Sequence, residues 1–293
     1  GMFSFFQVRP DGKQVVASIH QGPTTSYVLS HTFFNRSLED LRLTKFKDMA
    51  YYASTKIDMA GASGVYTPDS KELIMCNLVQ SCLVIDSETL LPKSKFRACA
   101  NSTLFITQAP GIFVSASNNQ ILVTCSDERV SVIARGSNGT FAYKEDIFPC
   151  GSVIGDDPVT VTYGQVEAPH QFVFIGCSSR SKKNPMHIAV YLTNNDNGLD
   201  RMWSYEPFPP NQTLFVLSLT SNPQRDLLML TVYNRTTDNY RFDSLCLLSV
   251  NVASFTVHDC KEPCSSQNGL FYTWAPDGRQ VLSGCSVLDE KLT

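Results

Sequence analysis

The sequence predicts an all-β protein built from about six repeated four-stranded units. Three observations lead to this prediction. A phrase centred on Pro-Asp-Gly recurs along the chain at nearly constant spacing, and each copy lies between two apolar runs rich in Val, Ile, Phe, Leu and Tyr. No long segment shows the 3.6-residue period of a helix, and only residues 37–62 leave room for a helical turn or two.

The recurring phrase has six copies, which begin with "RPDGKQVVAS" and end with "APDGRQVLSG". Aligned on the proline, the copies place this slot at Pro10, Pro68, Ser117, Pro169, Pro223 and Pro276, in steps of 58, 49, 52, 54 and 53 residues. Proline presets φ for the first turn position, and Asp, Asn or Gly tolerate the positions that follow. Each copy therefore predicts a strand, a tight turn and a second strand.

Further strand candidates follow the hairpins and bring each unit to about four strands. They are "SYVLS" and "DLRLTKF", then "CLVID", "RVSVIA" and "TFAYKE", "HIAVYLT" and "RMWSYE", and "SLCLLSV" and "SFTVHD". Four-stranded units at a spacing of about fifty residues are typical of β-propeller blades. We expect one propeller domain over residues 1–293, with blades that begin near residues 3, 64, 112, 159, 214 and 270.

The two ends of the chain carry almost the same phrase, because a ring of blades has no natural first member. The residues after Pro276 and before Pro10 fill only about half a blade, so we expect the last blade to be incomplete. Three explanations for the incomplete blade stay open: the chain has been trimmed, the last blade is naturally short, or a partner donates the missing strands by β-augmentation.

The phrase "PDGKQVVAS" resembles the inner hairpin of WD40-type repeats, which is commonly written as a short apolar run, then S-P-D-G, then L-A-S-G. The likeness is close at Pro10, Pro68 and Pro276. No Gly-His opens a blade and no Trp-Asp closes a third strand, and the two tryptophans are Trp203 and Trp274. The chain is thus similar to a divergent WD40-like propeller, and other propeller families stay open.

The chain has ten cysteines and five Asn-X-Ser/Thr sequons, a combination found in secreted proteins. The repeat favours a different interpretation. The position eight residues past the proline slot takes a small residue in every copy: Ser18, Cys76, Cys125, Cys177, Thr231 and Gly284. Cysteine in such a packing slot behaves as a small buried hydrophobe. We therefore expect buried, reduced cysteines, sequons that arise by chance, and an intracellular protein in the cytoplasm or nucleus; secretion is the alternative.

The stretch "HDCKEPC" holds the residues considered for a metal, His258, Cys260 and Cys264. A structural zinc site needs four ligands, and no second pair at metal spacing follows. A zinc site, a local disulfide and free thiols in a loop remain the three interpretations, of which we expect free thiols and no metal.

Composition and motifs narrow the function further. With 43% hydrophobic and 17% charged residues and a formal net charge of −3, the chain is globular and lacks the basic stripe of a nucleic-acid-binding protein. No run of eighteen apolar residues predicts a membrane span. No G-x-S-x-G, H-E-x-x-H, phosphate loop or G-x-G-x-x-G occurs, so we expect no catalytic residues and no cofactor.

Loop length points to a working face. The turns between first and second strands are tight, whereas the connections between second and third strands and from blade to blade are longer and variable. In this topology the longer connections emerge on one face, and loops on a rigid scaffold commonly carry binding residues. The residues predicted to contact a partner are Lys47, Tyr51, Tyr52, Arg180, Lys182, Lys183, Tyr240 and Arg241.

These features together favour a non-enzymatic scaffold that binds a peptide or protein partner within a larger assembly, as the WD40-like resemblance implies. One alternative is a propeller enzyme, or the propeller domain of an enzyme, with a dispersed site at the central channel. Another is a secreted or cell-surface recognition propeller.

Overall fold

The structure is a computed structural model that describes most of the chain. Residues outside the description are 1, 12–13, 21–25, 33–62, 78–80, 90, 100–110, 126–127, 152–155, 168–169, 180–186, 207–213, 223–226, 235–240, 251–254, 262–272, 276, 283–286 and 290–293. All regular secondary structure in the described part is β-strand. The chain divides into two compact units, Gly1–Ile147 (unit 1) and Phe148–Thr293 (unit 2).

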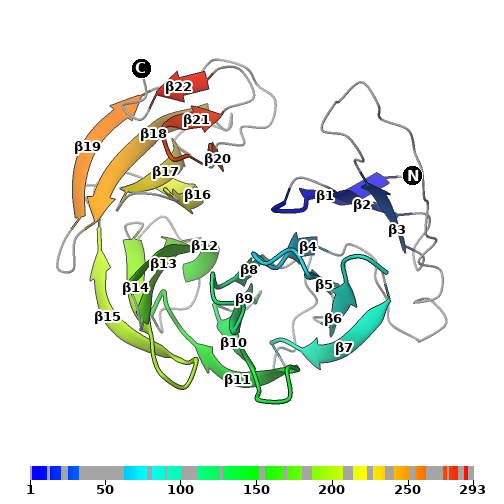
Figure 1. Ribbon diagram of the computed structural model, residues 1–293. Helices are drawn as coiled ribbons and strands as arrows, with labels where there is room; N and C mark the ends of the chain where they lie inside the picture. Colours follow the sequence, from blue (N-terminus) through cyan, green and yellow to red (C-terminus); the bar gives the residue numbers. More distant parts are fainter. Residues whose placement is uncertain are drawn as a thin grey trace. The chain divides into compact units, whose positions relative to one another are not determined.

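Unit 1 contains three antiparallel sheets in which each strand pairs with its neighbour in the chain. The first sheet comprises β1 (Met2–Val8), β2 (Gln14–His20) and β3 (Ser26–Thr32). The second comprises β4 (Ser63–Tyr66), β5 (Glu72–Cys76), β6 (Ser81–Asp86) and β7 (Pro92–Arg97). The third comprises β8 (Ile112–Val114), β9 (Gln120–Thr124), β10 (Val130–Arg135) and β11 (Phe141–Ile147). The first strands β1, β4 and β8 lie next to one another in that order (Figure 1).

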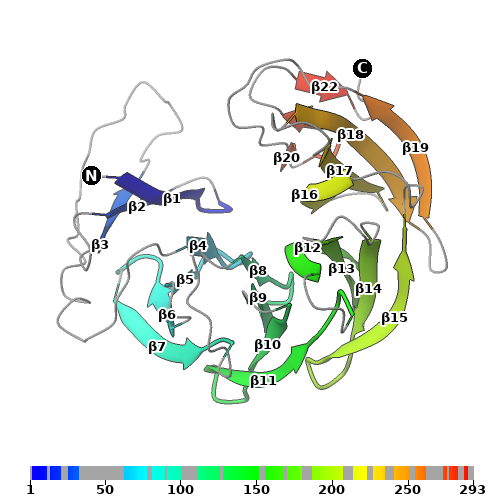
Figure 2. The same cartoon turned by 180° about the vertical axis from the view of Figure 1, so that it is seen from behind.

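Unit 2 repeats this arrangement. One four-stranded sheet comprises β12 (Asp156–Glu167), β13 (His170–Ser179), β14 (His187–Thr193) and β15 (Leu199–Tyr205). The next comprises β16 (Leu214–Ser221), β17 (Leu227–Asn234), β18 (Arg241–Val250) and β19 (Phe255–Lys261). The last comprises β20 (Thr273–Trp274), β21 (Gln280–Leu282) and β22 (Val287–Asp289). Here β16 contacts both β12 and β20, and Figure 2 shows β12 beside β16.

The core of each unit lies between facing sheets. In unit 1, Ile74, Val84 and Phe96 of the second sheet belong to one buried cluster with residues of the third sheet, such as Ile121 and Ile133. A corresponding cluster in unit 2 joins residues of β13 and β14 to residues of β16 and β17. Middle strands are covered on both faces, since all five residues of β5 are buried. Such strands favour continuous apolar runs, which is why the sequence pattern revealed them.

The outermost strands follow another pattern. In β7, four of the six residues are exposed and one is buried, because this strand is the edge of its sheet. Its sequence, "PKSKFR", carries two lysines and an arginine, residues that protect exposed edges from pairing with other chains. For this reason β7 was not predicted from the sequence. The predicted strands that the structure confirms are "SYVLS", "CLVID", "RVSVIA", "TFAYKE", "HIAVYLT", "RMWSYE", "SLCLLSV" and "SFTVHD".

The Pro-Asp-Gly phrase forms a type of turn that explains its composition. The amide of Ser70 donates to the carbonyl of Thr67 (2.8 Å), that of Asn118 to Ser115 (2.9 Å), and that of Gly278 to Ala275 (2.8 Å). The donors adopt φ of 65°, 59° and 67°, the left-handed region that glycine occupies without strain. These bonds place Ala116, not Ser117, at the position of Pro68, so the predicted slot in the third copy is wrong by one residue.

Six sheets agree with the predicted number of units, and in the described residues both the first and the last sheet have three strands. The candidate strand "DLRLTKF" lies in the part of the chain that is not described. That all six sheets form a single domain stays a prediction. Within the described ranges, no helix is long and apolar enough to cross a membrane.

Candidate functional site

Each four-stranded sheet has two distinct edges at which its strands are joined. We call the edge where strands one and two, and strands three and four, are joined the turn edge. The loop edge is the opposite end, where strands two and three are joined and the chain passes to the next sheet. Polar side chains of unit 1 gather at both edges.

The residues predicted to contact a partner fall almost entirely outside the described part of the chain. This applies to Lys47, Tyr51, Tyr52, Arg180, Lys182, Lys183 and Tyr240, while Arg241 is placed as the first residue of β18. Their role therefore stays a prediction.

The metal candidates have a similar outcome. His258 and Cys260 lie on β19, where Cys260 is paired in register with Cys246 of β18, and Cys264 falls in the undescribed range 262–272. Among the described residues, no group of three or more His, Cys, Asp or Glu is placed to hold a metal.

At the turn edge of unit 1, Arg9 joins the first sheet to the second. Its side chain is only 5% exposed; it forms ion pairs with Asp11 (2.9 Å) and with Glu88 in the turn between β6 and β7. The amide of Asp11 also donates to Ser70 Oγ (3.2 Å), which belongs to the neighbouring sheet. A buried cation between two carboxylates is compensated in charge, so Arg9 acts as a clamp between the sheets.

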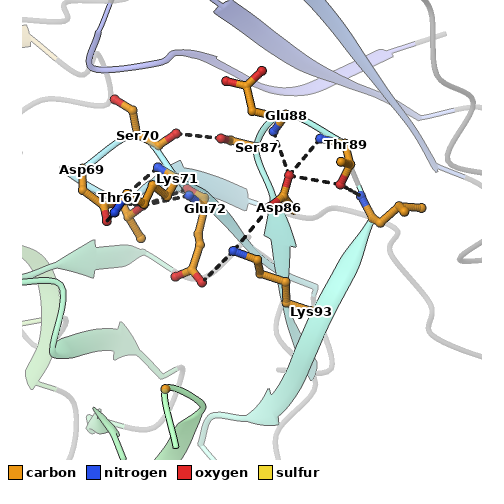
Figure 3. A network of polar contacts seen from close by, with 12 residues as sticks. Thr67, Asp69, Ser70, Lys71, Glu72, Asp86, Ser87, Glu88, Thr89 and Lys93 are labelled. Carbon is orange, nitrogen blue, oxygen red and sulfur yellow. Dashed lines mark hydrogen bonds and ion pairs between the residues drawn. The ribbon is translucent and has the colours of Figure 1, made fainter.

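Glu72 connects the second sheet to the third at the same edge. Its carboxylate is ion-paired with Arg135 at the end of β10 and lies 3.4 Å from Lys93 Nζ. Lys93 reaches Asp86 as well, also at 3.4 Å (Figure 3). The Arg135 guanidinium lies 4.1 Å from the centroid of the Phe141 ring, which adds a cation–π contact.

The turn between β6 and β7 is ordered by Asp86. Its Oδ1 accepts hydrogen bonds from Thr89 N (2.8 Å), Thr89 Oγ1 (3.0 Å) and Glu88 N (3.1 Å), as Figure 3 shows. The bond from the Thr89 backbone, with those from its side chain, Lys93 and Glu88, lowers the pKa of Asp86 although partial burial opposes the shift. These hydrogen bonds fix the turn that contains Glu88, the ion-pair partner of Arg9.

The loop edge of the third sheet holds a second, more deeply buried group. Arg129 is ion-paired with Asp146 (2.8 Å), and both side chains are 10% exposed or less. Ser131, fully buried, donates to Asp146 Oδ1 (2.5 Å) and accepts from the Cys99 amide (2.7 Å). The group therefore ties β10 and β11 to the segment that enters this sheet from the previous one.

Three disulfides lie at or near the loop edges, and they correct the expected state of the cysteines. Cys76 and Cys125 and Cys177 are buried, as predicted, but they are oxidised and not reduced. They do not pair with one another; the bonds are Cys76–Cys82, Cys99–Cys125 and Cys150–Cys177. The prediction failed because it compared only equivalent positions of different units, whereas the partners come from an adjacent strand or an entering segment.

The equivalence of Cys76 and Cys125 is also wrong. The Asn77 amide bonds to the Ser81 carbonyl, and the Cys125 amide bonds to that of Arg129, so Cys125 corresponds to Asn77.

The disulfides Cys99–Cys125 and Cys150–Cys177 occupy similar places in their sheets. Each fastens a segment that enters a sheet to the end of that sheet's second strand, with sequence separations of 26 and 27.

In unit 2, side chains bond to the backbone of neighbouring sheets near the turn edge. Ser221 at the end of β16 donates to the carbonyl of Tyr163 in β12, and its amide donates to Thr162 Oγ1 (3.2 Å). Asn222 Nδ2 donates to the carbonyl of Gly278 (2.8 Å), and Trp274 Nε1 to that of Thr220 (3.3 Å). These neutral contacts perform the linking that ion pairs perform in unit 1.

The ion-paired groups described above hold neighbouring strands and sheets together. The buried charges described above all lie in ion pairs. The pKa of Arg9 is raised and the pKa of Asp86 is lowered, in each case away from neutrality. For Arg9, burial opposes the rise, which the bonds to Asp11 and Glu88 produce. A general acid or base works best with a pKa near the operating pH.

Comparison with known proteins shows the fold. No protein-family model matches the chain, and no curated protein matches its sequence. The chain is similar to a candidate 6-phosphogluconolactonase from Bacteroides uniformis (TM-score 0.66, 15% identity, 98% of this chain and 80% of that one). It is also similar to a chain of the mitotic checkpoint complex (TM-score 0.63, 13% identity, 96% and 74%). These are β-propellers, and with the repeated antiparallel sheets they confirm the predicted β-propeller fold.

Proposed function

We propose that this β-propeller is a non-enzymatic scaffold that binds a peptide or protein partner within a larger assembly. The observation that carries the proposal is that disulfides and a buried ion pair hold the loop edge together. In unit 1, the disulfides Cys76–Cys82 and Cys99–Cys125 and the buried Arg129–Asp146 pair all lie at the edge from which the longer connections emerge. A scaffold held in one conformation loses little entropy when it binds, so its loops are presented at low cost.

The turn edge supports the same interpretation from the other side. There the charged groups are neutralised within and between the sheets through Arg9–Glu88 and Arg135–Glu72. Groups engaged in this way hold the sheets together and are not free for a partner. The loop edge therefore remains the favoured contact surface, with Lys47, Tyr51, Tyr52, Arg180, Lys182, Lys183, Tyr240 and Arg241 as the contact residues. Tyrosine and arginine are residues that often dominate interface energies.

The test is a comparison of two charge reversals. We expect the double substitution Arg180→Glu with Arg241→Glu to weaken capture of the partner from extracts of the source organism. The matched control, Lys71→Glu with Arg279→Glu, changes the net charge equally but alters two exposed residues of the turn edge. Both variants should melt within a few degrees of the parent protein. Lys71 and Arg279 are exposed, Arg180 and Arg241 are expected to be, and exposed substitutions usually change stability by about 0.5 kcal/mol or less.

The last sheet offers the competing contact. Its strands are short, and a partner strand that paired with its outermost strand would extend it by β-augmentation. Undiminished capture by the variant with Arg180→Glu and Arg241→Glu, with capture lost when the residues after Cys285 are deleted, would move the interface to the outermost strand of the last sheet. Equal loss in both double variants would instead indicate a general effect of charge and contradict the assignment to the loop edge.

A further inference from the structure

The turn between β10 and β11 presents a sequon at the surface. Residues 136–140 are all exposed, and they include Asn138, Gly139 and Thr140, the Asn-X-Thr pattern of N-linked glycosylation. Gly139 adopts φ of +78° and its amide donates to Gly136 (2.9 Å), which closes the turn. The asparagine therefore lies at the tip of a tight, ordered hairpin that projects into solvent.

The side chains of this sequon are already arranged around the Asn138 amide. Thr140 Oγ1 donates to Asn138 Oδ1 (2.7 Å), and the Thr140 backbone amide donates to the same oxygen (3.0 Å). Both hydrogen bonds use the carbonyl oxygen of the side chain. The amide nitrogen, to which a glycan is attached, is left without a bonding partner among the described residues.

The disulfides supply an independent observation. Cys76–Cys82, Cys99–Cys125 and Cys150–Cys177 are intact, and each of the six side chains is 6% exposed or less. Disulfides form and persist mainly in oxidising compartments, such as the lumen of the endoplasmic reticulum, and are rare in the cytosol. That lumen is also where Asn-X-Ser/Thr sequons of secreted proteins are modified, so the two features point to the same environment.

We infer that Asn138 carries an N-linked oligosaccharide and that the chain matures in an oxidising secretory compartment. In the modification, Asn138 Nδ2 attacks the anomeric carbon of a lipid-pyrophosphate-linked oligosaccharide. A C–N bond forms, the anomeric C–O bond breaks, the lipid pyrophosphate leaves with the electron pair, and the amide proton passes to a base of the transferase. This inference departs from the expected intracellular location, which depended on cysteines without partners.

The sequon at Asn138 lies at the opposite end of the strands from the loop edge, which is the proposed contact surface. Arg135 donates to the carbonyls of Asn118 (2.9 Å) and Gly139 (3.2 Å), so the sequon lies beside the β8–β9 turn at the turn edge. The loop edge is at the other end of the same strands. A glycan on Asn138 would cover the turn edge and leave the loop edge open, although the inference does not depend on the proposed function.

Peptide mapping of the full chain from its source organism tests the inference. Digestion without reduction should yield the three cross-linked cysteine pairs. Treatment with a peptide N-glycosidase in heavy-oxygen water should convert Asn138 to a labelled aspartate. An internal control is Asn197 in Asn197-Gly198-Leu199, in the β14–β15 turn, which has glycine next but no hydroxyl residue two positions on. Asn197 should stay unlabelled.

Three variants at two positions keep the test independent of folding. Asn138→Gln and Thr140→Ala should each lose one glycan, seen as a faster band before but not after deglycosylation, while Thr140→Ser should retain it. Both substituted positions, Asn138 and Thr140, are exposed, so the disulfide map should be unaltered in all three variants. An unmodified Asn138 in protein whose three disulfides are intact, or free thiols at those six cysteines, would overturn the inference.

Discussion

Arg135 of β10 forms an ion pair with Glu72 of β5, although 63 residues separate them in the chain. The two side chains are 21% and 11% exposed, and each has further partners. Arg135 also bonds to two backbone carbonyls and contacts the Phe141 ring, while Glu72 lies near Lys93. One guanidinium thus joins two sheets of unit 1 and orders two turns.

Replacement of Arg135 by methionine should destabilise the protein by about 2–4 kcal/mol, because it leaves a nearly buried carboxylate whose one remaining ion-pair partner in the described part of the chain is Lys93. Urea unfolding measures this loss. The control is Arg201→Met, which removes an exposed arginine bonded to Ser204 three residues away and should cost about 0.5 kcal/mol or less. Equal effects of the two substitutions would show that the ion pair contributes nothing beyond an exposed contact.

The disulfides should differ in their contribution to stability. In the chain-entropy description, the Cys99–Cys125 loop, with a separation of 26, contributes about 3.5 kcal/mol, and the Cys76–Cys82 loop, with a separation of 6, about 2 kcal/mol. The double alanine variant of the first pair should therefore unfold at lower urea concentration than that of the second. A thiol reagent should leave all six residues unlabelled in the native parent; rapid labelling would contradict the bonds.

Substitution of Asn118 by glycine should stabilise the protein by about 1 kcal/mol. Asn118 adopts φ of 59°, and its Oδ1 is buried without a hydrogen-bond partner among the described residues. Glycine relieves both costs, which exceed the extra chain entropy of about 0.5–1 kcal/mol that glycine brings. The neighbouring Ser117→Gly brings the same entropy without relief and should destabilise. Thermal unfolding of the two variants should shift in opposite directions, and a shared direction would refute the argument.

At acid pH, the parent protein should no longer be more stable than the Asp86→Asn variant. Hydrogen bonds, first that from the Thr89 backbone, lower the pKa of this carboxyl in the folded state below its ordinary value of about 3.8. The unfolded chain therefore binds its proton first as pH falls, so the stabilisation is complete above that value and is lost as pH falls through the folded-state pKa. Urea unfolding of Asp86→Asn and the parent should differ at neutral pH and converge in acid. A gap that stays constant would show that charge is not the cause.

Local chemistry made the hairpins predictable. Proline, aspartate and glycine act on φ within a few residues, so "TPDS" and "APDG" specify their turns in any surroundings. The third copy shows the limit of this reasoning: "SASNNQ" lacks proline, and only the hydrogen bond from Asn118 to Ser115 revealed that the alignment was off by one. The edge strand β7 escaped prediction for a related reason, since its exposed residues carry no apolar pattern.

The candidate site was less predictable. The sequence singled out loop residues by length and polarity, and most of them lie outside the described ranges, so this part stays a prediction. The disulfides at the loop edge and the Arg129–Asp146–Ser131 group were not predicted from the sequence. Arg129 and Asp146 are 17 residues apart on two strands, and no short motif signals such a pair.

The order of the strands, the repeat and the turn chemistry follow from the linear sequence, because they depend on backbone preferences and on burial patterns within a few residues. Which cysteines are joined and which charges are paired depended on the tertiary structure. A cysteine in an apolar strand has the same sequence context whether its thiol is free or bonded. Cys99 and Cys125 are 26 residues apart, and they meet because the segment that enters the third sheet lies against the end of β9. Likewise, Arg9 and Glu88 are 79 residues apart, and the packing of neighbouring sheets brings them together.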